Sequence, residues 1–484
     1  MQYINAPALI RTSSFINGVW QQAEQTFSVI NPATGQVLQQ VADASVADAG
    51  QAVLAAHQAF SQWSGLPAAE RAARLLRWHQ LMLLHQDDLA RLLTLEQGKP
   101  LAEARGEITY GASFLQWFAE EAKRVYGDII PAPTTDKRIL VLKQPVGVVA
   151  AITPWNFPNA MIIRKAAAAL AAGCTFVVKP AQQTPLSALA MAELSVEAGI
   201  PAGVFNVVVS SDAKGTGKVF TEHPLVAKFS FTGSTATGKQ LLQQCASTVK
   251  RVSMELGGNA PFIVFDDADL DAAVQGLMAS KFRNAGQTCV CANRVLVHSH
   301  IYPAFTYKLL QAVSQLNVAD GLTTGSQIGP LINEQAVAKV EQLVQSAISN
   351  GAQLLLGGSR ATDLGPQFYL PTVLSEVTAD MDIARQEIFG PVISLLQFDN
   401  EQQAIALAND TEFGLASYFY SRDIGRIFRV AEQLQYGMAG INEGIISDAA
   451  APFGGVKQSG SGREGSKYGL DDYLNIKYLC LGGI

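Results

Sequence analysis

The chain has 484 residues, 48% of them hydrophobic, and a formal net charge of −6. This length predicts two or three domains with sizeable cores, and the negative charge argues against a nucleic-acid partner, because phosphate binding needs a basic surface. Five cysteines without framework spacing favour a reducing, cytoplasmic compartment. We expect no signal peptide and no membrane segment, since the first residues lack a basic start and every apolar run is interrupted.

The first 140 residues predict a mixed structure. Short β-like pieces lie between residues 15 and 41, and helical spacing of Ala, Leu, Glu and Arg runs from residue 45 to about residue 124. Residues 128–136 are rich in Pro, Asp and Thr, which indicates a loop.

From residue 146 onwards, strands and helices alternate with short connections. The predicted strands are 145–153, 175–179, 204–209 and 226–232, and the predicted helices are 159–172, 185–198, 215–222 and 236–246. This order predicts right-handed crossovers and a largely parallel sheet, with binding sites beyond the carboxyl ends of its strands. A hinge-like segment, 255–261, leads to a second alternating stretch up to about residue 435, and residues 471–481 are β-like.

Two segments at predicted strand ends suit cofactor or oxyanion chemistry. In Thr153-Pro-Trp-Asn-Phe-Pro158 two prolines fix the backbone around Asn156, whose amide donates hydrogen bonds without titrating. A capping Asn in a Pro-rich turn explains this segment equally simply. Residues 231–238, FTGSTATG, open a helix whose N–H groups suit a pyrophosphate, although Thr235 replaces the middle glycine of the dinucleotide fingerprint. A plain glycine turn is the alternative.

Two further segments suit covalent chemistry. Glu255 ends a predicted strand beside two glycines, where burial would raise its pKa and make it a general base; an exposed strand-terminal glutamate is the alternative. Cys289 follows Gly286, so a tight turn places it on a loop, where a thiolate could form thioesters; a buried, inert cysteine is the alternative. No metal site is expected, since His298 and His300 lack a further ligand at a recognisable spacing.

Together the segments TPWNFP, VVKP, FTGST, ELGG, GQTC and EIFGP resemble, in this order, the aldehyde dehydrogenase superfamily. The resemblance implies a nucleophile at Cys289, an oxyanion donor at Asn156 and a base for the hydrolytic water at Glu255. It also implies an NAD or NADP site in which Lys179 binds the adenosine ribose, Ser234 the pyrophosphate and Glu387 the nicotinamide ribose. The other cofactor-binding residues expected from it are Trp155, Gln182, Gly233, Leu256 and Phe389.

The fold implied by the resemblance is α/β, with a Rossmann-type cofactor domain, an α/β catalytic domain and a bridging β element that mediates oligomerisation. We expect residues 1–120 and 146–258 to form the dinucleotide-binding domain and residues 259–440 the catalytic domain. The bridging element would consist of residues 121–145 and 441–484. In the family the C-terminal tail commonly pairs across subunits, which implies a homodimer or homotetramer.

A narrower resemblance, to succinate-semialdehyde dehydrogenases, lies in residues 289–294, 440–447, 452–460 and 462–469. It implies that Arg164, Arg283 and Ser447 hold a substrate carboxylate, which an arginine grips with two parallel hydrogen bonds. A structural ion pair is the alternative for each arginine. The same resemblance implies Cys291 as a redox partner of Cys289, with a small packing residue as the alternative.

One position departs from the pattern of NAD-preferring relatives, which often carry a glutamate three residues after the ribose lysine. Gln182 stands there in this chain. A carboxylate repels a 2′-phosphate, whereas a neutral amide can donate to it. We therefore expect NADP or NAD as cofactor, and a preference for NADP is the hypothesis to test.

The expected function is oxidation of succinate semialdehyde to succinate through a thiohemiacetal and a thioester on Cys289. The alternatives are a glutarate-semialdehyde or broad-range aldehyde dehydrogenase and, in a different class, a non-catalytic binding protein that kept the fold. Glu255 argues against a CoA-acylating enzyme, because hydrolysis needs that base. The combination of Cys289, Glu255 and Asn156 argues against the binding protein.

Overall fold

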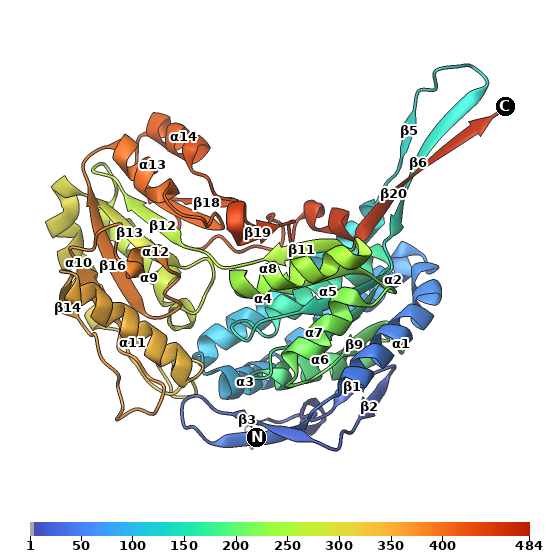
Figure 1. Ribbon diagram of the computed structural model, residues 1–484, viewed down its shortest axis with the longest axis horizontal. Helices are drawn as coiled ribbons and strands as arrows, with labels where there is room; N and C mark the ends of the chain where they lie inside the picture. The colour runs from blue at the N-terminus through green and yellow to red at the C-terminus, as the bar shows by residue number, and fades with distance from the viewer. Residues whose placement is uncertain (1–3) are drawn as a thin grey trace.

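The computed structural model describes residues 4–484, which form two large sheets side by side, each covered by helices (Figure 1). A third, three-stranded sheet projects from this body as an arm that ends near the C-terminus. None of the helices in residues 4–484 is long and apolar enough to cross a membrane. The predicted α/β class is confirmed.

The first sheet has the strand order β19-β11-β10-β7-β8-β9-β1-β2. Its strands from β11 to β9 run parallel, as the alternating pattern predicts, and β1, β2 and β19 add antiparallel edges. The bounds are β1 (Ser14–Ile16), β2 (Val19–Gln21), β7 (Val148–Ile152), β8 (Thr175–Lys179), β9 (Phe205–Val207), β10 (Val226–Thr232), β11 (Arg251–Glu255) and β19 (Gly460–Ser461).

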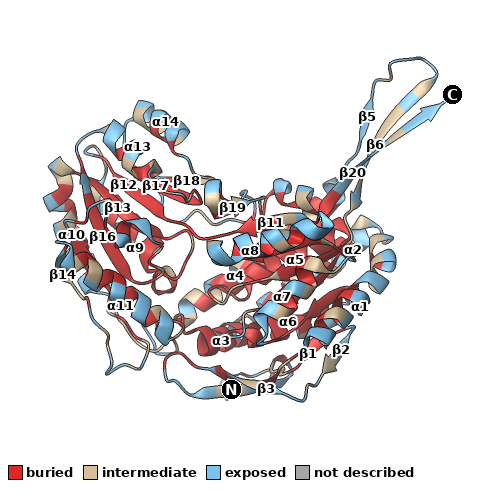
Figure 2. Cartoon of the chain, in the orientation of Figure 1, coloured by how far each residue is buried: buried red, intermediate tan, exposed pale blue. Residues whose placement is uncertain are grey.

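Eight helices surround this sheet: α1 (Val46–Ser64), α2 (Ala68–Leu84), α3 (Gln86–Gln97), α4 (Leu101–Glu121), α5 (Ala160–Ala172), α6 (Pro185–Glu197), α7 (Ala213–Glu222) and α8 (Thr235–Cys245). Helix α5 is alanine-rich and buried on every side, which is typical of a core helix. Helix α1 begins at a capping box formed by Ser45 and Asp48. Figure 2 shows the sheet buried between these helices.

The register of the parallel strands brings the predicted motifs to one edge of the sheet. Thr232 at the end of β10 pairs with Glu255 at the end of β11, and Ile152 at the end of β7 pairs with Lys179 at the end of β8. The carboxyl ends of parallel strands meet at one edge, so the segments that follow them are neighbours in space.

The second sheet has the order β14-β15-β16-β13-β12-β17-β18 and is parallel except for β14. The segment 256–259 leads directly from β11 of the first sheet into β12 of the second. Bounds of the strands are β12 (Ala260–Val264), β13 (Ala292–His298), β14 (Gln353–Leu356), β15 (Thr372–Ser375), β16 (Val392–Phe398), β17 (Ala416–Tyr420) and β18 (Met438–Ile441). Its helices are α9 (Leu270–Phe282), α10 (Tyr302–Ser314), α11 (Glu334–Ser349), α12 (Asp382–Arg385), α13 (Glu401–Asn409) and α14 (Ile424–Gln433).

The arm consists of β5 (Asp128–Ile130), β6 (Lys137–Pro145) and β20 (Leu474–Gly482), all antiparallel. The predicted loop at 128–136 is therefore wrong for residues 128–130, because their strand depends on pairing with β6 and not on local composition. The C-terminal strand begins at Leu474 and not at residue 471, since Lys467–Tyr473 forms a 3-10 helix. A separate hairpin joins β3 (Thr26–Ile30) and β4 (Val37–Ala42).

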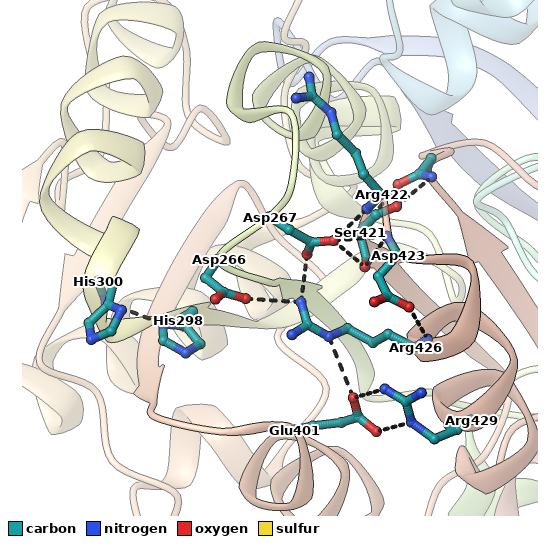
Figure 3. A network of polar contacts seen from close by, with 11 residues as sticks. Asp266, Asp267, His298, His300, Glu401, Ser421, Arg422, Asp423, Arg426 and Arg429 are labelled. Atoms are coloured by element: carbon teal, nitrogen blue, oxygen red, sulfur yellow. Dashed lines mark hydrogen bonds and ion pairs between the residues drawn. The ribbon is translucent and has the colours of Figure 1, made fainter.

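A polar network attaches α14 to the second sheet (Figure 3). Arg426 on α14 forms ion pairs with Asp266 at 2.9 Å, Asp267 at 2.6 Å and Glu401 at 3.4 Å. At its edge lie the rings of His298 and His300, 4.9 Å apart. Within residues 4–484 no group of three or more His, Cys, Asp or Glu side chains could hold a metal ion, so the two histidines have no further ligand beside them.

Candidate active site

Cys289 lies on the loop that precedes β13. Three consecutive residues of this loop, Asn284, Ala285 and Gly286, have left-handed backbones with φ of 52°, 54° and 76°. A Cβ on Gly286 would lie 2.1 Å from the carbonyl oxygen of Gly390, so the turn requires glycine. Left-handed Asn and Ala cost about 1–3 kcal/mol each. Such backbone strain is typical of functional loops, and it holds Cys289 out of the core.

As a whole residue Cys289 is partly exposed, whereas Cys291 is buried. Burial raises the pKa of the Cys289 thiol to about 12, and the charge of Glu387 acts in the same direction. Cys291 donates to the carbonyl of Gly286 at 3.2 Å and lies 4.0 Å from the ammonium of Lys281. All five cysteines are free thiols.

Asn156 lies in the turn after β7 and faces the Cys289 loop. Its Nδ2 donates to the carbonyl of Gln287 at 3.0 Å, which leaves the second N–H of the amide for another acceptor. Its own carbonyl accepts from Lys99 Nζ at 2.7 Å and from Asn284 Nδ2 at 2.9 Å. The amide is thus fixed beside the nucleophile loop through both its side chain and its backbone.

Glu255 is buried, and neither carboxylate oxygen has a hydrogen-bond partner within residues 4–484. Burial raises its pKa well above the usual range, and the charge of Glu464 raises it further, while Arg164 and Lys165 oppose the shift. A carboxylate with a raised pKa and free lone pairs is suited to accept a proton from water.

Glu464 is a member of this cluster that the sequence analysis did not single out. It is buried and forms ion pairs with both Arg164 and Lys165. Lys165 also donates to Ser230 Oγ on β10 at 3.0 Å. The contact between Lys165 and Glu464 joins positions 299 residues apart. Its only sequence signal was the segment 462–469, which was noted above for its resemblance alone.

A cavity of about 500 Å³ collects most of the residues proposed above for the cofactor and the chemistry. Those of the predicted residues that line it are Trp155, Asn156, Gly233, Ser234, Glu255, Leu256, Cys289, Glu387 and Phe389. The rings of Trp155 and Phe389 meet edge to face with centroids 5.5 Å apart. Segments from both large sheets therefore meet around one cavity.

The walls of this cavity suit a pyrophosphate and a ribose. Ser234 caps α8, accepting from the N–H of Thr237, so the first N–H groups of the helix point toward an anion site. Glu387 accepts from the N–H of Gly258 at 3.1 Å, and burial raises its pKa to about 7. A Cβ on Gly257 would lie 3.0 Å from Glu387, so glycine leaves this wall open.

Lys179 and Gln182 lie apart from that cavity. Lys179 ends β8 and is buried, which lowers its pKa to about 8, although the carboxylates of Asp43 and Asp212 oppose the shift. Gln182 lines a separate cavity of about 270 Å³ together with Ser211. Lys179 is the last residue of β8 and Gln182 lies on the turn that follows it.

A second large cavity, of about 680 Å³, lies on the other side of the Asn156 turn and is lined by both Arg283 and Ser447. The Arg283 guanidinium lies 4.7 Å from the centroid of the Phe157 ring. Glu103 and Tyr110 also line this cavity and were not predicted. The two residues expected to hold a carboxylate thus share one space next to the nucleophile loop.

Arg164 does not line this cavity. Its guanidinium is buried in the ion pair with Glu464 and lies 4.2 Å from the centroid of the Phe453 ring. The arrangement is the structural ion pair considered above as the alternative. A direct contact between Arg164 and a substrate carboxylate stays a prediction.

A scan against protein-family models matches residues 20–479 to the aldehyde dehydrogenase family. The chain belongs to the aldehyde dehydrogenase family. This confirms the predicted family and enzyme class. A 3-sulfolactaldehyde dehydrogenase from Pseudomonas putida is 61% identical over 100% of both chains.

Two further relatives of the same family differ in the substrate that their names carry. An NADP(+) succinate-semialdehyde dehydrogenase from Escherichia coli strain K12 is 59% identical over 99% of both chains. A glutarate-semialdehyde dehydrogenase from Pseudomonas aeruginosa is 58% identical over 98% of this chain and 99% of the relative. Similarity alone therefore does not select one aldehyde.

The raised pKa of Cys289 predicts a slow, steadily increasing reaction with iodoacetamide, because only the thiolate is alkylated. With a pKa of about 12, the alkylation rate should increase about tenfold per pH unit from about pH 7 to about pH 10. Peptide mass spectrometry measures this rate for Cys289, with a short, unstructured peptide that contains one cysteine as control. A rate that levels off between about pH 9 and pH 10, as that of the control peptide should with a pKa of about 8.5, would contradict the raised pKa of Cys289 in the apoprotein.

Proposed function

We propose that this protein oxidises succinate semialdehyde to succinate with NADP or NAD, through a thioester on Cys289. The observation that carries the proposal is that Arg283 and Ser447 line one cavity next to the loop of Cys289. Arg283 and Ser447 also line a small space of about 10 Å³ together with Thr288 and Val290, the two neighbours of Cys289 in the chain. An aldehyde with a short carboxylate tail can bridge these positions.

In the first step the Cys289 thiol gives its proton to water in the cavity. Its sulfur then bonds to the aldehyde carbon while the carbon–oxygen π bond breaks, which forms a thiohemiacetal alkoxide. Negative charge develops on the aldehyde oxygen during this step, and the unpaired N–H of the Asn156 amide and the backbone N–H of Cys289 receive it. Fixed donors of this kind lower a barrier by about 3–4 kcal/mol each. When bound, the nicotinamide supplies the hydride acceptor that oxidises the thiohemiacetal to the thioester.

The second step is hydrolysis of the thioester. Glu255 accepts a proton from water, the resulting hydroxide adds to the thioester carbon, and the carbon–sulfur bond breaks to release the acid and the Cys289 thiol. Glu464 keeps the proton affinity of Glu255 high, while Arg164 and Lys165 limit the repulsion between the two carboxylates. The cluster therefore keeps a base with a raised pKa in a buried position.

The residues around the 500 Å³ cavity fit a dinucleotide. The capped N-terminus of α8 suits the pyrophosphate, Glu387 has an acceptor for a ribose hydroxyl, and Trp155 and Phe389 shape the wall beside Cys289. Lys179 and Gln182 would hold the adenosine ribose. Gln182 places no carboxylate against a 2′-phosphate, which supports NADP as well as NAD.

Glutarate semialdehyde is the second candidate, and 3-sulfolactaldehyde is a third raised by the relatives. All three substrates have an aldehyde at one end and an anionic group at the other, which is what Arg283 recognises. The cavity of about 680 Å³ has room for each of them. A difference of one methylene is worth only about 1–3 kcal/mol in such a pocket, so kinetics must rank them.

We further propose that the arm joins subunits in a homodimer or homotetramer. Its apolar side chains are open to solvent, with Ile129, Ile476 and Tyr478 exposed by 80%, 74% and 60%. Apolar strands at an open edge are costly in an isolated subunit. We also propose the domains given in the sequence analysis. The dinucleotide-binding domain is built around the first large sheet and the catalytic domain around the second.

Replacing Arg283 with Met should raise KM for succinate semialdehyde about 10- to 100-fold, because a charged hydrogen-bonding partner of the carboxylate is lost. KM for butanal, which has no carboxylate, should change less than about threefold. The measurement is steady-state NAD(P)H absorbance with both aldehydes. The control is Arg77→Met, which removes an exposed arginine paired with Glu197. Equal increases in KM for both aldehydes would contradict the carboxylate grip.

Replacing Gln182 with Glu should lower kcat/KM for NADP at least about tenfold, because the new carboxylate repels the 2′-phosphate. The value for NAD should stay within about threefold, which makes NAD the internal control. Both cofactors are titrated against saturating succinate semialdehyde. A strong NAD preference in the unmodified protein, or an equal loss with both cofactors, would refute the role given to Gln182.

A further inference from the structure

A buried ion pair that the sequence analysis did not single out lies behind the Asn156 turn. Lys99, just before α4, and Glu107, on α4, are joined at 2.6 Å between Nζ and Oε2, and neither side chain has any exposed area. Lys99 lines neither of the two large cavities, whereas Glu107 is one of the residues that line the 680 Å³ cavity. Neither residue has a part in the chemistry proposed above.

Both partners of the ion pair contact the turn that contains Asn156. Lys99 Nζ donates to the carbonyl oxygen of Asn156 at 2.7 Å. Glu107 Oε1 accepts from the N–H groups of Asn159 at 2.9 Å and Ala160 at 3.2 Å, at the start of α5. The ion pair therefore holds residues 156–160 at both ends against α4.

The ring of Phe157 connects this ion pair to the substrate cavity. Lys99 Nζ lies 3.8 Å from its centroid and the Arg283 guanidinium 4.7 Å from it. One aromatic side chain thus contacts the buried ammonium and the arginine proposed for the carboxylate. The position of the turn affects both ends of a bound substrate.

The ion pair is poorly explained by stability alone. Removing two charges from water costs several kcal/mol per ion, and an apolar pair of similar volume often stabilises a fold as well or better. Burial opposes the charge on Lys99, and Glu107 is its principal compensation. The remaining hydrogen bonds of the two side chains go to the Asn156 turn. The buried charges therefore act mainly to hold this turn in place.

The amide of Asn156 has little else to orient it. Its Nδ2 donates to Gln287, and its Oδ1 has no hydrogen-bond partner within residues 4–484. The direction of its free N–H therefore depends on this one side-chain hydrogen bond and on where the backbone of the turn lies. A shift of about 1 Å in such a group can cost about 100-fold in rate.

We propose that Lys99 and Glu107 are positioning residues that aim the Asn156 amide at the oxyanion. The inference rests on the proposed role of Asn156. Lys99 fixes the carbonyl of Asn156 itself, and Glu107 fixes the start of the helix that follows. Asn284 also donates to the Asn156 carbonyl at 2.9 Å, so the turn keeps one partner when Lys99 is replaced.

A double-mutant cycle between Lys99 and Asn156 tests the proposal. Asn156→Ala should lower kcat about 100- to 1,000-fold, as removal of an oxyanion donor does. Lys99→Met should lower kcat about 10- to 100-fold, while KM for the cofactor changes less than about threefold. Because Lys99 acts through Asn156, kcat of the double variant should lie within about threefold of kcat of Asn156→Ala alone.

The matched control is Lys250→Met. Lys250 is also buried and donates to two backbone carbonyls, those of His223 at 2.6 Å and Val226 at 2.8 Å, at the opposite end of β11 from Glu255. The Lys250→Met variant should unfold at a lower temperature than the unmodified protein, with kcat unchanged. Glu107→Gln is the second variant, because it preserves the side-chain volume and an acceptor for α5 while removing the charge. It should lower kcat alone, and it should lower kcat little further when it is combined with Asn156→Ala.

The outcomes separate the proposal from the function on which it rests. If Asn156→Ala lowers kcat but Lys99→Met and Glu107→Gln stay within about twofold of the unmodified protein, the positioning role is refuted and the function stands. If losses from Lys99 and Asn156 multiply, Lys99 acts on stability or elsewhere and the role is also refuted. If Asn156→Ala leaves kcat unchanged, both fail.

Discussion

Two buried carboxylates in electrostatic contact are the constraint on which this site depends. Glu255 and Glu464 repel each other, and burial alone would already favour their neutral forms. Arg164 and Lys165 hold Glu464 in its charged form through two ion pairs, so the repulsion acts mainly on Glu255. The consequence is one carboxylate with high proton affinity and free lone pairs beside the cavity that Cys289 lines.

The fold assembles this cluster from distant parts of the chain. Parallel register places the ends of β7, β8, β10 and β11 at one edge, and the segment 256–259 leads from there into the second sheet, beside the loop of the nucleophile. Glu464 arrives from the C-terminal region, 299 residues after Lys165. The loop of the nucleophile contains three consecutive left-handed residues. Gly390 packs so closely against the last of them, Gly286, that only glycine fits there. The residues proposed for catalysis therefore lie where the two large sheets meet.

Local patterns were sufficient for the central strands, whereas the roles of the chemical groups were predicted from the family resemblance. The strands at 175–179 and 226–232 have the predicted bounds, because these apolar runs are short and rich in β-branched and aromatic residues. The strand at 128–130 was not predictable from composition, since only β6 opposite it makes it a strand. The same reason hid Glu464, which lies 299 residues from Lys165, and the contacts of Lys99 and Glu107 with the Asn156 turn, more than 50 residues away. Arg164 was predicted from resemblance, with an ion pair as the alternative, but Glu464 could not be identified as the partner.

The most direct test of the thioester mechanism is mass spectrometry of a Glu255→Gln variant mixed with succinate semialdehyde and NADP. Without the base, hydrolysis slows while attack and oxidation continue, so the acyl group should accumulate on Cys289. The account predicts a mass increase equal to one succinyl group on the peptide that contains Cys289, with one equivalent of NADPH formed. NADPH formation without a covalent adduct, or an adduct on another cysteine, would contradict it.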